Sequence, residues 1–324
     1  MRYLASRFAQ MLLVLWVVAT LLFLMFRLLP ADPTSAFIDP TFTMEQQAEI
    51  RAAFGLDKPL WEQYFIYFAN LLQGEFGQSF FQQRPVLDIL VSALPNTIML
   101  TVTALLVAYG FGVLAGAWLA WKRGSWVEAV AVPAVLTVRA APEFWLGMIL
   151  LAVFGFGLSW FPSGGANSAG ARFDSELARL FSLDFWHHMF LPALTLALYL
   201  QGLPLLLMRS NMLEVMQEDY VTMARMKGLP ESRIVLRHAA RNALLPVVTA
   251  FTLGLGATVG GNVVVETVFS WPGLGRVLVT AVASSDYPLA QGAFLLITVV
   301  LVVMNFAADL LYSVLDPRVS HGRG

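Results

Sequence analysis

Basic side chains are concentrated in a polar segment, residues 210–242, that separates two long apolar runs of this 324-residue chain. From Asp219 to Asn242 the segment reads DYVTMARMKGLPESRIVLRHAARN. Basic groups at this density recognise acidic groups, either on a protein partner or on anionic lipid headgroups. The chemistry that these residues suggest is therefore recognition at one side of a membrane. The basic residues of the segment are Arg225, Lys227, Arg233, Arg237, His238 and Arg241.

Two breaks in this segment predict a helical hairpin. We expect one helix to run from the preceding apolar stretch through Lys227, with Gly228 ending it in the left-handed conformation. Pro230 suits the first position of a second helix, and Glu231 then lies near the positive end of that helix.

Three arginines follow at a spacing of four residues. Arg233, Arg237 and Arg241 would share one face of a regular α-helix. Anchoring to lipid headgroups and docking to a soluble protein both explain such a face. The hairpin itself favours docking, because a plain loop would be enough for lipid anchoring.

A second pair of charges, Arg139 and Glu143, flanks Pro142 inside an apolar stretch. Charged groups within a membrane are costly and often functional. A purely structural ion pair that faces the interior of the helix bundle is the alternative, and the sequence leaves both open.

Motifs for catalysis are absent from the sequence. There is no GxxxxGK[ST], no HExxH and no GxSxG motif, and the chain has no cysteine. Its four histidines (His187, His188, His238 and His321) lack metal-ligand spacing. We expect the chain to bind no cofactor, metal or nucleic acid, so that energy comes from a partner or an ion gradient.

Composition predicts an integral membrane protein of the all-α class. The chain is 58% hydrophobic and only 13% charged, with a mean hydropathy of +0.70, whereas soluble domains carry about 25% charged residues. Apolar runs of about 20 residues predict membrane-spanning helices. We expect six spans within a single transmembrane domain. They lie near residues 8–29, 97–121, 130–156, 189–208, 243–265 and 288–311.

The distribution of Lys and Arg predicts the orientation. With the N-terminus inside, twelve basic residues fall in inner segments and six in the longer outer segments. The positive-inside rule then places both termini and the loop 210–242 in the cytoplasm. The outer ones are Arg51, Lys58, Arg84, Arg172, Arg179 and Arg276.

The outer region 30–96 is expected to be helical in part, with an aromatic-rich helix over residues 60–72. Residues 271–274 fit a type II turn, followed by a short helix over 277–283. Gly112 and Gly116, four residues apart, allow another helix to approach closely. Polar residues of the spans are candidates to line a path on polarity alone, although packing is the favoured role for each one taken singly. They are Asn96, Thr101, Gln201 and Asn262.

Several segments resemble those of the ABC-importer permeases, and most of all the peptide-importer subfamily. They also occur in the family's order along the chain. Asp219 to Leu229, with Arg237-His238-Ala239 and Arg241 to Pro246, resembles the EAA loop of that family. Similar segments cover nearly the whole chain. They are Leu28 to Pro33, Leu94 to Thr97, Pro142 to Gly147 and Glu266 to Gly275.

The resemblance implies a heteromeric importer in a bacterial cytoplasmic (inner) membrane. A second homologous permease would complete the pathway, two cytoplasmic ATPases would use ATP and Mg²⁺, and a periplasmic or extracellular binding protein would deliver peptides or similar solutes. The helix before Gly228 would be the coupling helix. The implied coupling residues are Asp219, Tyr220, Ala224, Arg225, Lys227, Gly228, Arg233, Arg237, His238, Asn242 and Pro246.

The chain departs from the family pattern in three places. Thr222-Met223-Ala224 stands in the positions of Glu-Ala-Ala, Ala31 replaces the usual glycine, and Glu143 replaces a small neutral residue. An ion-coupled secondary carrier is the alternative, with Arg139 and Glu143 as its candidate charges. A membrane-embedded enzyme would need a catalytic constellation in the spans, which the sequence lacks.

Overall fold

The structure is a computed structural model that describes residues 2–27, 43, 45, 58–259 and 262–315. Within these residues the regular secondary structure is helical, apart from an isolated β-bridge between Gln78 and Pro85, so the predicted all-α class is confirmed. Most of the outer region 30–57, including the segment up to Pro33 that resembles the family, lies outside the described residues.

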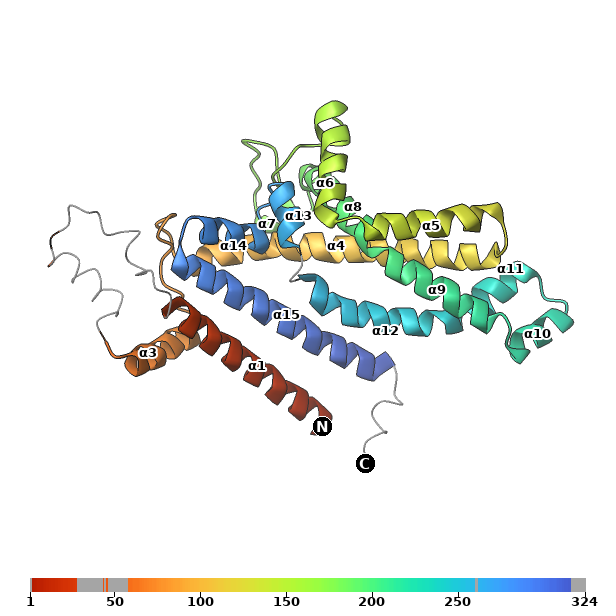
Figure 1. Cartoon of the computed structure of the whole chain (residues 1–324), viewed down its shortest axis with the longest axis horizontal. Helices are drawn as coiled ribbons and strands as arrows, with labels where there is room; N and C mark the ends of the chain where they lie inside the picture. Colours follow the sequence, from red (N-terminus) through yellow and green to blue (C-terminus); the bar gives the residue numbers. More distant parts are fainter. Residues whose placement is uncertain (1, 28–42, 44, 46–57, 260–261, 316–324) are drawn as a thin grey trace.

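Long helices are separated by groups of short ones in the described chain after residue 140 (Figure 1). The longer helices are α1 (Arg2–Arg27), α3 (Leu60–Gln73), α4 (Val86–Trp121), α5 (Trp126–Ala140), α8 (Leu183–Leu200), α9 (Gly202–Val215), α12 (Ala240–Val259) and α15 (Tyr287–Leu315). The shorter helices are α6 (Glu143–Leu150), α7 (Glu176–Leu180), α10 (Asp219–Met226), α11 (Glu231–Arg233), α13 (Val263–Val268) and α14 (Leu274–Ala283), with π-helical turns at Leu151–Gly157 and Ile234–Ala239.

Among the described residues, three helices are long and apolar enough to cross a membrane, namely Ser6–Arg27, Val86–Trp121 and Tyr287–Leu310. Two bent helix pairs, α5 with α6 and its π turn, and α8 with α9, also qualify if each pair is one span. Helix α12 occupies most of the predicted fifth range, 243–265. Helix α3 matches the aromatic-rich helix that the sequence predicts over residues 60–72.

The third predicted span, 130–156, is not one straight helix. Helices α5 and α6 meet at an angle of 102° at Ala141 and Pro142. Proline lacks the amide proton of a helical hydrogen bond, and it disfavours helical backbone in the residue before it. Ala141 is accordingly extended, with φ −70° and ψ 141°.

The fourth predicted span, 189–208, is also broken into two helices, and the second of them, α9, ends earlier than expected. Helix α8 begins after Ser182, whose hydroxyl accepts a hydrogen bond from the amide of Phe185 at 3.1 Å. Helix α9 follows at a bend of 41°. It ends at Val215, and the expected continuation to Lys227 is wrong, because the chain turns back so that α10 can bury its apolar side.

Helix α4 is the longest helix described and packs along α9 at two glycines. A Cβ atom on Gly116 would lie 2.4 Å from the carbonyl oxygen of Leu205, and one on Gly112 would lie 2.9 Å from Pro204 Cγ. Only glycine permits this separation of the two helices, so the predicted close approach at these residues is confirmed.

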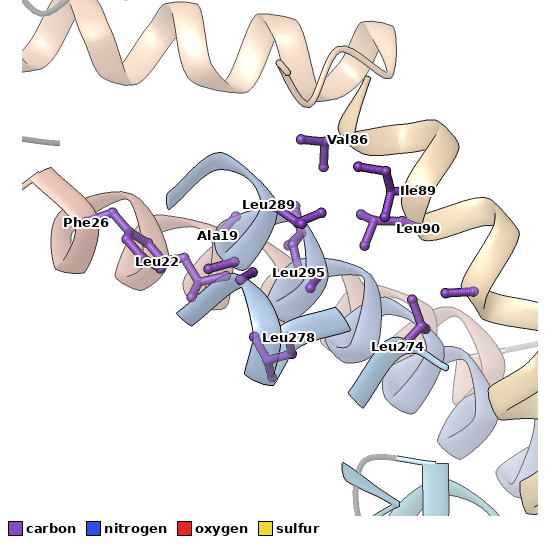
Figure 2. Close-up of a cluster of buried hydrophobic side chains, with 14 residues drawn as sticks. Ala19, Leu22, Phe26, Val86, Ile89, Leu90, Leu274, Leu278, Leu289 and Leu295 are labelled. Carbon is purple, nitrogen blue, oxygen red and sulfur yellow. The ribbon is translucent and has the colours of Figure 1, made fainter. Parts of the chain in front are cut away.

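Helices α1 and α15 are antiparallel neighbours. Arg7 pairs with Asp309 at 3.3 Å near one end, and the rings of Phe26 and Tyr287 lie 5.9 Å apart at the other. Figure 2 shows the apolar cluster that joins these helices to α14 and the start of α4. Its labelled residues include Leu22 and Leu289, with 8% and 1% of their surfaces exposed.

Candidate functional site

The hairpin after α9 forms as the sequence predicts around Gly228. Helix α10 ends at Met226, and Gly228 has a φ of 74°, in the left-handed region where glycine is favoured. The amide of Leu229 then donates to the carbonyl of Ala224 at 3.3 Å. Pro230 lies one position earlier than expected, as the residue that precedes α11, so Glu231 is the first helical residue.

A small apolar core holds the two arms of the hairpin together. Val221 and Ile234 are fully buried and Ala224 is 6% exposed. They pack against Val215, Met216 and Leu229. The hairpin is thus a folded unit with its own core at the end of α9, not an extended loop.

Polar contacts tie the same arms together on the surface. Arg225 pairs with Glu231 at 2.9 Å, and this contact raises the pKa of the arginine. Asn242 Nδ2 donates to the Tyr220 hydroxyl at 2.7 Å, and that hydroxyl is 3.5 Å from the carbonyl of His238. Tyr220 therefore connects α10 to the start of α12.

The outward side of α10 combines apolar and charged groups. Met223 and Met226 are 62% and 82% exposed. Asp219 and Lys227, at the two ends of the helix, are exposed as well. Flexible methionine side chains adapt to a complementary surface, and flanking charges can fix an orientation on it. This side of α10 suits docking to a protein.

The expected arginine face has a different geometry. Arg233, Arg237 and Arg241 are all exposed, but residues Ile234–Ala239 form a π turn, so the regular α-helical spacing of four is wrong. The wider turn allows Ile234, Val235 and Ala239 to be buried together on the inner side. Farther along α12, Pro246 is exposed within the helix.

An ion pair that sequence reasoning missed links the helices at the base of the hairpin. Arg209 Nε on α9 donates to Glu128 Oε1 at the start of α5, at 2.8 Å. The second oxygen of Glu128 accepts from the amide of Gly124 at 2.6 Å. The position of Glu128 in the first turn of a helix was the available signal, but the sequence did not reveal its partner 81 residues away.

Arg139 and Glu143 are not paired in the structure. The 102° bend at Pro142 separates their helices, and the structure shows no ion pair between these two described residues. Arg139 instead lays its aliphatic stem on Gly202, where an added Cβ would lie 2.8 Å from Arg139 Cδ. The secondary-carrier alternative depended on this charge pair.

The polar residues considered for a path are buried within this chain. Asn96, Thr101, Gln201 and Asn262 are each at most 8% exposed. Asn262 donates a hydrogen bond to Thr101, and Asn96 donates to the carbonyl of Pro272 at 2.8 Å. In the single chain these residues pack helices against one another.

Glu266 anchors the far end of the bundle, a role that the sequence did not reveal. The residue is fully buried. Its carboxylate accepts from the Thr97 hydroxyl at 2.7 Å and from the amide of Arg276 at 3.1 Å.

The predicted type II turn over residues 271–274 is wrong, and Gly273 is required for a different reason. A Cβ on Gly273 would lie 2.3 Å from Glu266 Oε1, so glycine is required there by close approach. The φ of Gly273 is −103°, and the positive φ of a type II turn is absent. The short helix expected after the turn is confirmed as α14.

Comparisons with known proteins agree with this architecture. Residues 112–321 match the family described as binding-protein-dependent transport system inner membrane component, and residues 1–101 match its N-terminal family. The chain is 35% identical over 321 residues to the glutathione transport system permease protein GsiC of Escherichia coli (strain K12), and 36% identical to GsiC of Salmonella typhi. Each alignment covers 99% of both chains. The chain belongs to this family of inner membrane components and is a permease subunit of an ABC importer.

Proposed function

We propose that this chain is half of a permease pair whose α10 hairpin seats in a groove of a partner ATPase. A second, homologous permease completes the pathway, and a solute-binding protein delivers the solute from outside. Two cytoplasmic ATPase subunits use ATP and Mg²⁺, while this chain supplies no catalytic group. Hydrolysis reaches the pathway as a movement of the hairpin.

One observation carries this proposal: α10 is rigidly mounted but presents an apolar outer side. The buried Val221, Ala224 and Ile234 fix the hairpin, whereas Met223 and Met226 remain exposed. A rigid element transmits force, and an exposed apolar patch gains free energy when a partner covers it.

The base of the hairpin connects this surface to the helices that would move. Arg209 lies on α9, which is the helix directly before the hairpin, and it binds Glu128 at the start of α5. A displacement of α10 would pass along α9 to α4 at the glycine contact, and to α5 through this ion pair.

We infer that both termini and the hairpin face the cytoplasm. The excess of Lys and Arg in these segments supports that orientation. The antiparallel pairing of α1 and α15 supports a common side for the two termini, since Arg7 and Asp309 meet near those ends.

For the substrate, we propose small peptides of the size of glutathione. The support is the full-length similarity to GsiC, whose name gives glutathione transport. Uptake of labelled glutathione by cells that express the complete transporter, compared with cells lacking this chain, would test the substrate separately from the coupling role.

Met226→Glu tests the docking surface. A charge buried in an apolar groove is costly, so we expect roughly tenfold less ATPase to copurify with the transporter. The matched control is Leu177→Glu, which makes the same kind of change at a 68% exposed position of the short helix α7.

Two outcomes would contradict the proposal. Undiminished ATPase recovery and transport with Met226→Glu would show that α10 is not the docking surface. Equal losses in both variants would attribute the effect to a general defect in assembly.

A further inference from the structure

A cavity of about 210 Å³ lies between the Arg27 end of α1, helix α3, the segment that follows α3, and the start of α15. A single water needs roughly 10–15 Å³ of such space, and pockets for drug-sized ligands begin near about 300 Å³. The volume therefore suits a small polar group or the headgroup of a larger amphiphile.

Two polar atoms at this cavity have no hydrogen-bond partner within the described part of the chain. Gln63 is only 8% exposed, and its Nε2 donates to the carbonyl of Lys58 at 2.7 Å, which leaves Oε1 without a donor. The Tyr67 hydroxyl is near Gln291 but lacks a partner in hydrogen-bonding geometry. Buried polar atoms are rarely left unpaired, so these two indicate a missing ligand group that donates to Gln63.

The ionic groups at the cavity have opposite signs. Arg27 and Glu75 both line it, and neither forms an ion pair among the described residues. Burial raises the pKa of Tyr67 to about 12, so its hydroxyl stays protonated and can donate to an anion. The cavity is thus equipped for a ligand that carries both a cation and an anion.

The position of the cavity is at the ends of two membrane-spanning helices. Arg27 is the last residue of α1, and Tyr287 is the first of α15. Just before Arg27, α1 exposes Leu21 and Leu24, at 58% and 40%. Helix α3 exposes Trp61 and Phe65, at 66% each, and aromatic residues favour the membrane interface. Headgroups of a surrounding bilayer would lie at this level, with acyl chains beside the apolar surface of α1.

We propose that this cavity binds the headgroup of a phospholipid with a primary ammonium, of the phosphatidylethanolamine class. The ammonium donates to Gln63 Oε1 and to the Glu75 carboxylate. The phosphate accepts from the Arg27 guanidinium and from the Tyr67 hydroxyl. The acyl chains lie along α1.

Native mass spectrometry of the purified full-length chain, titrated with defined lipids, tests this inference. Phosphatidylcholine has the same phosphate but no N–H donor. Because hydrogen bonds to charged groups are among the stronger ones, we expect phosphatidylethanolamine to bind roughly tenfold more tightly than phosphatidylcholine.

Variants locate the site. Gln63→Met removes the unpaired oxygen at similar volume, and we expect it to abolish the preference for phosphatidylethanolamine. Gln73→Met is the matched control, because Gln73 is on the same helix but is exposed and does not line the cavity. If Gln63→Met fails to fold, Glu75→Gln replaces it, with the same expected loss of preference. Tyr67→Phe removes only a contact to the phosphate, so it should weaken the binding of both lipids equally.

Several results would overturn the proposal. These are equal binding of the two zwitterionic lipids, preference for phosphatidylglycerol, no retained lipid, and a preference unchanged in every cavity variant. Displacement of the lipid by glutathione, a soluble zwitterion, would instead assign the cavity to a soluble solute. None of these results depends on ATPase docking, so they are independent of the hairpin test.

Discussion

Gly228 determines the shape of the hairpin through its backbone conformation. With a φ of 74°, it ends α10 and turns the chain toward α11. An added Cβ would meet no atom within 4 Å. Any effect of a side chain at this position is therefore conformational and not steric.

We predict that Gly228→Val uncouples transport from ATP hydrolysis or prevents the ATPase from docking. Left-handed backbone costs an L-residue about 1–2 kcal/mol, and a β-branched residue adopts it with most difficulty. Pull-down of the tagged chain from mild detergent, with ATPase and transport assays of the recovered complex, measures the effect.

Gly228→Asn is the control, because asparagine tolerates left-handed backbone better than other residues. It should retain most of the coupling. Normal transport by a normally expressed Gly228→Val variant would refute the role assigned to this backbone conformation.

At the scale of elements, the contact between α4 and α9 depends on two glycines. The chain of α9 passes so close to Gly116 that a methyl group would contact the backbone of Leu205. Close to the same contact, Arg209 of α9 binds Glu128 at the start of α5. Helix α9 is thus held to both α4 and α5 before the chain enters the hairpin.

We predict that Gly116→Ala lowers the free energy of unfolding by about 1–3 kcal/mol, because overpacking moves the helices apart. The control is Gly110→Ala in the same helix, where an added Cβ meets nothing within 4 Å. That change should be neutral or stabilising, since alanine favours helix over glycine. Thermal unfolding of the purified chain, followed by tryptophan fluorescence, compares the two. Equal destabilisation by both changes would contradict the close-packing argument.

At the scale of the whole molecule, the arrangement of spans predicts which side of the membrane each connecting segment faces. The chain contains no cysteine, so single cysteines can be labelled without background. Ser232→Cys in the hairpin and Ala171→Cys in the segment before α7 are both exposed positions.

A membrane-impermeant maleimide should label Ala171→Cys in intact cells and Ser232→Cys only after the membrane is opened. The reverse pattern would invert the proposed orientation. Labelling of both positions in intact cells would place the two segments on the same side and contradict the predicted topology.

Local rules in the sequence determined several features of this protein. Apolar runs predicted the membrane class, Gly228 predicted the end of α10, and the spacing of Gly112 and Gly116 predicted a close helix contact. In each case the cause lies in a few neighbouring residues, so the sequence alone carries it.

Tertiary structure decided the rest, because distant parts of the chain had to meet. Helix α9 ends at Val215 so that α10 can bury Val221 against Ile234. Gly273 is required by the carboxylate of Glu266, not by a turn type. The bend at Pro142 could be suspected locally, but only the fold showed that it separates Arg139 from Glu143. Glu128 pairs with Arg209, which is 81 residues away in the sequence, and no local pattern encodes such a contact.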